Sequence, residues 1–99
     1  MHSLWEEIAY DGRRIRLTEA QRHHISFFHP EALINEERLK ETLTKPDLVA
    51  RGAQAAIRVL YRHYESTPVT SKYLAVVVRV LNGEGFIVTA TLQIRYEGP

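Results

Sequence analysis

The sequence contains no cysteine, so a disulfide framework, a thiolate metal site and a cysteine nucleophile are excluded. Its apolar runs are much shorter than a membrane span. Near the start, Glu6 and Glu7 stand where a signal peptide needs positive charge. We therefore expect a soluble cytoplasmic protein without a membrane partner.

A strong net charge is also missing, because 13 Lys and Arg against 12 Asp and Glu leave a formal charge of +1. Attraction to phosphate scales with the number of cations presented, so a surface for nucleic acid would have to be local. Six of the 13 Lys and Arg lie in the strand-rich second half of the chain, where few acids accompany them, whereas most of the acids lie in the first half. This polarity is compatible with an anionic ligand or with a mixed solvated surface.

Motifs for phosphate, metal or acyl chemistry are absent. The serines lie in no Gly-x-Ser-x-Gly context, and the chain has no glycine-rich phosphate loop. Among the five histidines, His24 and His29 are followed by Glu31, but their spacing matches no zinc signature. We predict neither a metal ion nor a cofactor.

What the chain does contain fits one globular domain over residues 1–99, with 44% hydrophobic and 25% charged residues. Residues 1–17 resemble a hairpin or extension, because Asp11 and Gly12 are a turn signal, and residues 18–96 form the core. Thr18 followed by Gln21 is a capping box that starts a first helix, expected to end near Phe28. A second helix is expected from a cap at Asn35 to the residues before Pro46.

Strand patterns fill the rest of the chain, at residues 48–51, 56–64, 72–81 and 86–96. The connections between them are short, which favours antiparallel neighbours, because parallel pairing needs long crossovers. The predicted fold class is α+β, with two N-terminal helices packed on a four-stranded antiparallel meander sheet, preceded by a short β-hairpin.

Alternation predicts which side chains share a face of that sheet. In residues 72–81 the apolar face starts at Leu74, and the other face carries Tyr73 and Arg79. In residues 86–96 we place Phe86 on the apolar face. Matching apolar faces then brings five polar side chains from three strands to one surface: Arg58, Arg62, Arg79, Thr89 and Thr91.

That surface suits an anionic backbone, because guanidinium groups offer fixed donors and threonine hydroxyls bond phosphate oxygens. The same arginines could equally form exposed ion pairs of small energetic value. Tyr73 faces the arginines and could stack on a base, whereas Tyr61 is expected in the core.

Several pieces of the chain between Thr18 and Leu92 carry a resemblance to a known family. They are residues 18–25, 29–31, 45–49, 60–62, 72–78 and 85–90, with sequences TEAQRHHI, HPE, KPDLV, LYR, KYLAVVV and GFIVTA. In this order they resemble the phage-associated branch of the barnase, EndoU, colicin and RelE-like (BECR) superfamily of small nucleases. The chain has Thr91 where many relatives have an aromatic residue.

The resemblance implies RNA cleavage without metal, in a toxin module, a phage or a conflict system, with RNA as substrate and a cognate antitoxin or immunity protein as partner. It implies that His24, Arg62, Arg79 and Thr89 are catalytic. We expect Arg58, Tyr73, Thr91 and Arg95 to bind the substrate around them.

Two alternatives remain open at this point. His24 is also explained as a core histidine that bonds a backbone carbonyl. The whole chain is also explained as a non-catalytic module that holds RNA or a protein, or as half of a homodimer that pairs through the final strand.

Overall fold

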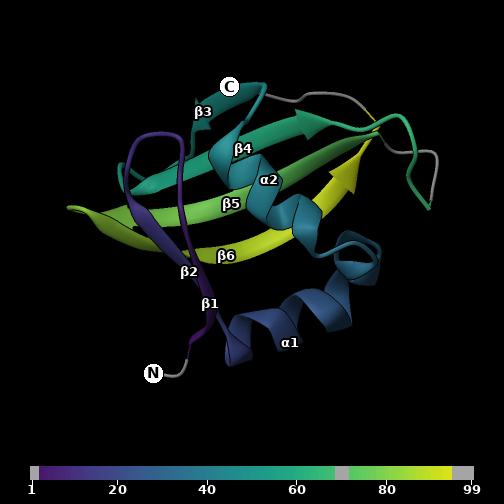
Figure 1. The fold of residues 1–99 in the computed structure, drawn as a ribbon, viewed down its shortest axis with the longest axis horizontal. Coiled ribbons are helices and arrows are strands. Elements are labelled where there is room, and N and C mark those ends of the chain that lie inside the picture. Colours follow the sequence, from purple (N-terminus) through teal and green to yellow (C-terminus); the bar gives the residue numbers. More distant parts are fainter. Residues whose placement is uncertain (1–2, 69–71, 95–99) are drawn as a thin grey trace.

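The computed structural model describes residues 3–68 and 72–94. Its elements follow the chain as β1 (Ser3–Ile8), β2 (Arg14–Thr18), α1 (Glu19–Phe28), η1 (Pro30–Leu33), α2 (Glu37–Thr44), β3 (Leu48–Arg51), β4 (Ile57–His63), β5 (Tyr73–Leu81) and β6 (Glu84–Gln93). Figure 1 shows α1 and α2 on the same side of one curved sheet.

The predicted four-stranded antiparallel meander is wrong. In the described residues the sheet has six strands in the order β1-β2-β6-β5-β4-β3, and β2 pairs with β6 in parallel, so the sheet is mixed. Parallel pairing is possible here because β2 and β6 are far apart in sequence, and the chain between them contains both helices and the strands β3, β4 and β5. The α+β class itself is right.

The expected hairpin is present, and both of its strands, β1 and β2, belong to the sheet. Ile15 of β2 lies opposite Gly85 of β6. A Cβ atom added at Gly85 would stand 2.9 Å from Ile15 Cδ1 and 2.5 Å from the Arg79 carbonyl oxygen. The β1 strand is tied to the helices as well, because Trp5 Nε1 donates a 2.9 Å hydrogen bond to Glu36.

Helix ends follow the local signals closely. The Thr18 hydroxyl accepts a hydrogen bond from the Gln21 amide at the start of α1, as the capping box predicts. The α1 helix ends at Phe28, before Pro30, and α2 ends at Thr44, before Pro46. The start of α2 differs from the prediction, because the helix begins at Glu37 and Asn35 does not cap it.

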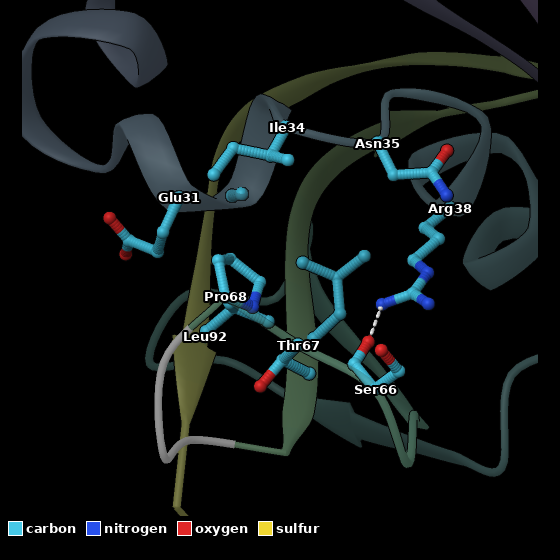
Figure 2. Close-up of a pocket in the computed structure, with 10 residues that line it drawn as sticks. Glu31, Ile34, Asn35, Arg38, Ser66, Thr67, Pro68 and Leu92 are labelled. Carbon is cyan, nitrogen blue, oxygen red and sulfur yellow. Dashed lines mark hydrogen bonds between the residues drawn. The ribbon is translucent and has the colours of Figure 1, made fainter.

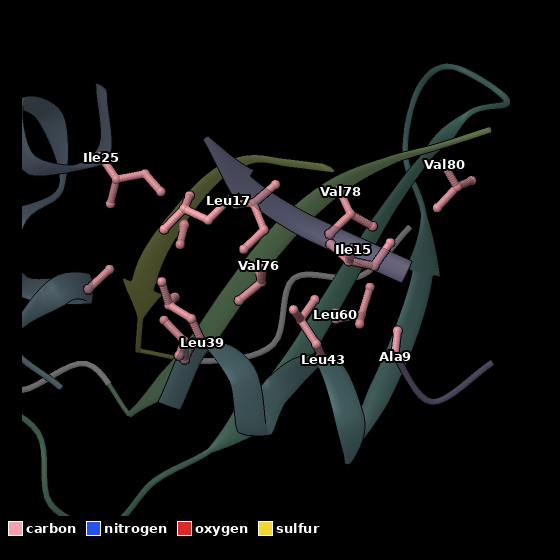
Figure 3. Packing of buried hydrophobic residues seen from close by; sticks show 14 residues of the cluster. Ala9, Ile15, Leu17, Ile25, Leu39, Leu43, Leu60, Val76, Val78 and Val80 are labelled. Carbon is pink, nitrogen blue, oxygen red and sulfur yellow. The ribbon is translucent and has the colours of Figure 1, made fainter. Parts of the chain in front are cut away.

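The main core lies between the helices and one face of the sheet (Figure 3). Ile25 of α1 and Leu39 and Leu43 of α2 are fully buried there. The sheet side of this core is made of Ile15, Leu17, Leu60, Leu74, Val76, Val78, Val80, Ile87 and Ala90.

A β-bulge in β6 changes the predicted pattern of that strand. Thr89 pairs with Val77 but Ile87 pairs with Val78, so Val88 is an extra residue with no partner of its own. Ile87 is therefore buried in the core, and Phe86 points to the opposite face with Arg79. The sequence-based expectation that Phe86 belongs to the apolar face is wrong, because simple alternation does not anticipate a bulge.

The alternative of a homodimer that pairs through the final strand required that strand to lie at the rim of the sheet, and β6 does not lie there. The β6 strand lies between β2 and β5. Its residues 84–86 pair with β2, and its residues 84–93 pair with β5. The edges of the described sheet are β1 and the four-residue β3.

Candidate functional site

The face of the sheet opposite α1 and α2 gathers most of the polar side chains predicted to act together. We call it the helix-free face, because neither described helix packs on it. Directly paired residues form rows across β4, β5 and β6 on this face. The rows are His63, Tyr73 and Gln93; Tyr61, Ala75 and Thr91; Val59, Val77 and Thr89; and Ile57, Arg79 and Phe86.

Four predicted site residues thus share one face: Tyr73, Arg79, Thr89 and Thr91. They do not share one point, because Tyr73 and Arg79 are six residues apart on β5, or roughly 20 Å at the usual strand rise. The face is long enough to hold an extended ligand but not to focus all four side chains on one phosphate.

Arg58 and Arg62 were predicted on this face and lie on the other one. Arg58 pairs with Val78 and Arg62 with Leu74, so both side chains share the side of Leu60 and of the helices. The prediction failed because Ile57, Val59 and Tyr61 look more apolar than Arg58, Leu60 and Arg62. In the structure both sides of β4 bury apolar side chains, so apolar content did not identify the helix side.

A second, smaller apolar cluster explains that ambiguity. Val59 packs on the helix-free face against three buried residues, Ala50, Tyr61 and Ala75. Tyr61 is therefore buried as expected, but on the side away from the helices. The sheet has apolar side chains at the centre of both faces.

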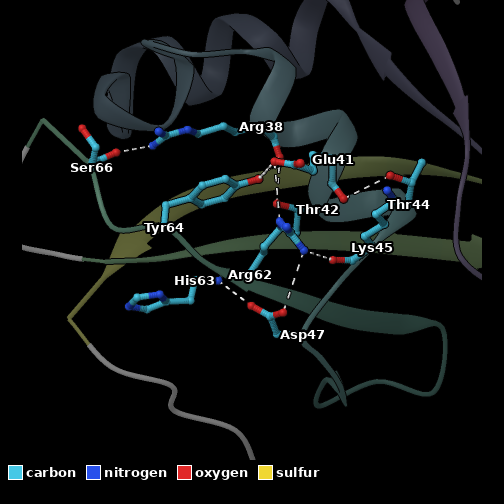
Figure 4. A network of polar contacts seen from close by, with 10 residues as sticks. All are labelled: Arg38, Glu41, Thr42, Thr44, Lys45, Asp47, Arg62, His63, Tyr64 and Ser66. Carbon is cyan, nitrogen blue, oxygen red and sulfur yellow. Dashed lines mark hydrogen bonds and ion pairs between the residues drawn. The ribbon is translucent and has the colours of Figure 1, made fainter.

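Arg62 joins the end of α2 to β4 in a polar network (Figure 4). Its Nη1 donates a 2.6 Å hydrogen bond to the Lys45 carbonyl. Its guanidinium also forms ion pairs with Glu41 at 3.5 Å and Asp47 at 3.8 Å. This arginine is largely occupied by the protein, which indicates a structural role for it.

Tyr64 completes the network. Its hydroxyl donates a 2.6 Å hydrogen bond to Glu41 Oε1, and the Arg38 guanidinium lies 4.3 Å from the centre of its ring. This hydrogen bond lowers the pKa of the Glu41 carboxyl. Burial, followed by the contact with Glu41, raises the pKa of Tyr64 to about 12. At neutral pH the pair is therefore a carboxylate and a neutral phenol.

Arg58 is likewise turned to the protein, since its Nη1 bonds the Ala55 carbonyl at 2.5 Å and the Ile57 carbonyl at 3.1 Å. Arg79 is exposed, and its Nη2 donates a 3.0 Å hydrogen bond to the Gln54 amide oxygen. Arg79 therefore keeps more of its charge available to a ligand than Arg58 or Arg62.

His24 is neither buried nor part of the helix-free face. The sequence-based prediction was that His24 points toward the sheet. In the structure it is exposed on α1, and the centre of its ring lies 4.9 Å from that of Phe28. The neighbouring Ile25 takes the buried position instead. The reading of His24 as a core histidine is therefore wrong. Arg95, the last predicted site residue, lies outside the described residues.

His63 was missed by the sequence-based reading and is the histidine of the helix-free face. Its ring lies 5.0 Å from the ring of Tyr73, and its Nδ1 is 3.7 Å from a Glu65 carboxylate oxygen. Its neighbour Arg62 belongs to a segment that resembles the nuclease family, whereas His63 itself lies outside every such segment. Alternation along β4 could have placed His63 beside Tyr73 once the strand register was known.

Two polar atoms on this face lack partners. Thr89 Oγ1 and Gln93 Oε1 are buried and accept no hydrogen bond from the described residues. Buried polar atoms are usually satisfied, so each is a point where a ligand or water could bond. Gln93 stands in the same row as His63 and Tyr73.

A pocket lies on the helix side, between η1, α2 and the segment that contains Ser66 (Figure 2). It has a volume of about 310 Å³, and Ala32, Leu74 and Leu92 contribute apolar surface to it. Arg38 lies on its wall and donates a hydrogen bond to the Ser66 carbonyl. None of the seven predicted site residues that the structure describes lines this pocket.

Among the described residues, no group of three or more His, Asp or Glu side chains could hold a metal ion. The helices of this part of the chain are also too short or too polar to cross a membrane. No family model, curated protein or solved structure matches the chain.

Proposed function

We propose that this protein is a small metal-independent ribonuclease that works through the helix-free face, with His63 as its proton-transfer group. The observation that carries the proposal is the row of His63, Tyr73 and Gln93, which puts an imidazole beside a phenol and an amide on neighbouring strands. Histidine titrates near neutral pH, so it can take or give the proton that RNA cleavage requires. The resemblance to small nucleases supports the same reaction.

In this reaction the base removes the proton of a ribose 2′-hydroxyl, whose oxygen attacks the adjacent phosphorus. The bond from phosphorus to the 5′-oxygen breaks, and an acid returns a proton to that oxygen. The products are a 2′,3′-cyclic phosphate and a 5′-hydroxyl, with no net change of protons. Tyr73 and Gln93 are donors beside the imidazole that can hold the phosphate oxygens while charge develops.

Arg79 cannot contact the same phosphate, given its separation of roughly 20 Å from Tyr73 along β5. This separation favours a second candidate, in which the face holds RNA without cutting it. Binding needs only cations and stacking surfaces along the strand, whereas cleavage needs the proton-transfer group. Either way, RNA is the proposed partner and the cytoplasm the proposed location, with an inhibitor protein as a further partner if the enzyme is a toxin.

Incubation of the purified protein with total RNA in excess chelator tests the proposal. Specific fragments that end in cyclic phosphate are expected, and His63→Gln should reduce their rate of formation at least about 100-fold. His23→Gln, on the exposed side of α1, is the control and should cut at the wild-type rate.

The alternative centre is tested with His24→Gln. Loss of cutting in that variant, with cutting retained in His63→Gln, would assign the reaction to the histidine implied by the family resemblance and contradict ours. Retention of intact RNA by the wild-type protein would favour the binding module.

A further inference from the structure

The bulge in β6 moves a phenylalanine from the core to the helix-free face. Phe86 would face the helices if the strand alternated without interruption from Ala90, but the extra residue Val88 reverses the direction of the side chains before it. Ile87 fills the core position, and Phe86 is only partly buried. Bulges that re-aim side chains are over-represented next to functional sites.

Phe86 lies between two arginines on this face. Its partner on β5 is Arg79 and its partner on β2 is Arg16. Neighbouring strands are about 4.8 Å apart, so the three side chains start from adjacent positions in one row. An aromatic ring with a guanidinium on either side combines a stacking surface with two fixed charges.

Neither arginine is strongly engaged elsewhere in the described structure. The Arg79 guanidinium bonds a neutral amide, that of Gln54. Arg16 Nη2 stands 3.8 Å from a Glu84 carboxylate oxygen, and both side chains are partly exposed, at 36% and 64%. An exposed ion pair at this distance contributes less than about 1 kcal/mol, so an incoming phosphate can replace it.

We propose that Phe86, Arg16 and Arg79 form a nucleotide subsite that binds single-stranded RNA. One base stacks on Phe86, and the two arginines hold the phosphates on either side of it. Single-stranded RNA is the occupant because its unpaired bases stack on exposed aromatic side chains and its backbone requires cations. A duplex would keep its bases stacked inside and leave the ring unused.

This inference rests on the proposed function and extends it, because the subsite lies at the other end of the face from His63. Six residues of β5 separate the two rows, or roughly 20 Å. An RNA strand that crosses the face would be cut near His63 and held near Phe86. The subsite should therefore affect RNA binding and leave the chemical step alone.

Fluorescence anisotropy with a labelled single-stranded 2′-O-methyl oligouridine tests the subsite, because the blocked 2′-oxygen prevents cleavage. Phe86→Leu should raise the Kd about tenfold, whereas Phe86→Trp should bind at least as well as the wild type. Phe27→Leu is the matched control, since Phe27 is 73% exposed on α1, and should leave the Kd unchanged. Arg79→Gln should lower the slope of log Kd against log salt by about one.

Equal affinity of Phe86→Leu and the Phe27→Leu control, or no binding by the wild type, would overturn the subsite. Thermal melting of each variant checks that the fold is retained. Binding that depends on Phe86 without cleavage of natural RNA would keep the subsite and contradict the ribonuclease. Cleavage by the wild type, together with RNA binding that does not depend on Phe86, would support the ribonuclease and contradict the subsite.

Discussion

The two faces of the sheet use the same kinds of residue for different purposes. On the helix side, Arg62 bonds the Lys45 carbonyl and pairs with Glu41 and Asp47. On the helix-free face, Arg79 bonds the neutral amide of Gln54, and Thr89 has a buried oxygen without a partner among the described residues. An arginine beneath helices is committed to the fold, whereas one on the other face remains available to a ligand.

The largest expected effect concerns the bulge in β6, which places Ile87 in the core and Phe86 on the helix-free face. Ile87→Asp should prevent folding, because it puts an unpaired carboxylate into the core, and such changes cost more than about 4 kcal/mol. Phe86→Asp, one residue earlier, should still fold with a loss of about 1 kcal/mol. Circular dichroism and urea unfolding measure both, and the opposite order would show that β6 has no bulge.

A second pair of neighbours compares how deeply the two faces are buried. Val76 is fully buried beneath the helices, whereas Val77 is partly buried on the helix-free face. Val76→Ala should lower the free energy of unfolding by about 2 kcal/mol, and Val77→Ala by less than about 1 kcal/mol. Equal losses in urea unfolding would mean that both faces are equally covered.

The arginines give a third comparison. Arg62→Met should lower the free energy of unfolding by about 1.5 kcal/mol, because it removes a charged hydrogen bond to the Lys45 carbonyl and the ion pairs with Glu41 and Asp47. Arg79→Met should change it by less than about 0.5 kcal/mol, since the residue is exposed. If Arg79→Met proved the more damaging, the division of roles between the faces would be wrong.

The smallest effect concerns pH and the contact between Tyr64 and Glu41. Tyr64→Phe should lower the free energy of unfolding by about 1 kcal/mol at neutral pH, where Glu41 is ionised and Tyr64 is not. The folded pKa of Glu41 is lowered, so its contribution is present above the ordinary value of 4.5 and is lost as acid protonates the folded carboxyl.

The loss of stability at alkaline pH follows from the raised pKa of Tyr64. Its contribution is complete below the ordinary value of 10.0 and is lost as the pH rises toward about 12. Unfolding experiments across pH should therefore show the wild type and Tyr64→Phe converging at both extremes. Tyr73→Phe, which removes a phenol hydroxyl on the face of the sheet opposite Glu41, is the control.

Local signals were read correctly from the sequence where a few neighbouring residues decide the outcome. Thr18 caps α1, Pro30 and Pro46 follow the helix ends, and β3 occupies the predicted residues 48–51. The apolar face of β5 was also right, because its alternation is uninterrupted. These features depend on hydrogen bonds and steric limits within one or two turns of the chain.

The candidate site was predicted only in part. Tyr73, Arg79, Thr89 and Thr91 share a face as expected, whereas Arg58 and Arg62 do not. His63 became visible only when β4 and β5 were paired, because nothing in its own sequence context distinguishes it from the other histidines. A row of side chains across strands is a property of register, and short stretches of sequence do not contain it.

The sequence by itself determined where α1 begins, where both helices end, the approximate positions of β3 to β6, and that neither disulfides nor thiolate ligands contribute. Only the tertiary structure decided that β2 pairs in parallel with β6, that Val88 bulges, and that Arg62 turns toward α2 while Arg79 turns away. The physical reason is that propensity and capping act between neighbours in the chain. The choice of face depends instead on which distant apolar surfaces fit together, and β4 offers such a surface on both of its sides.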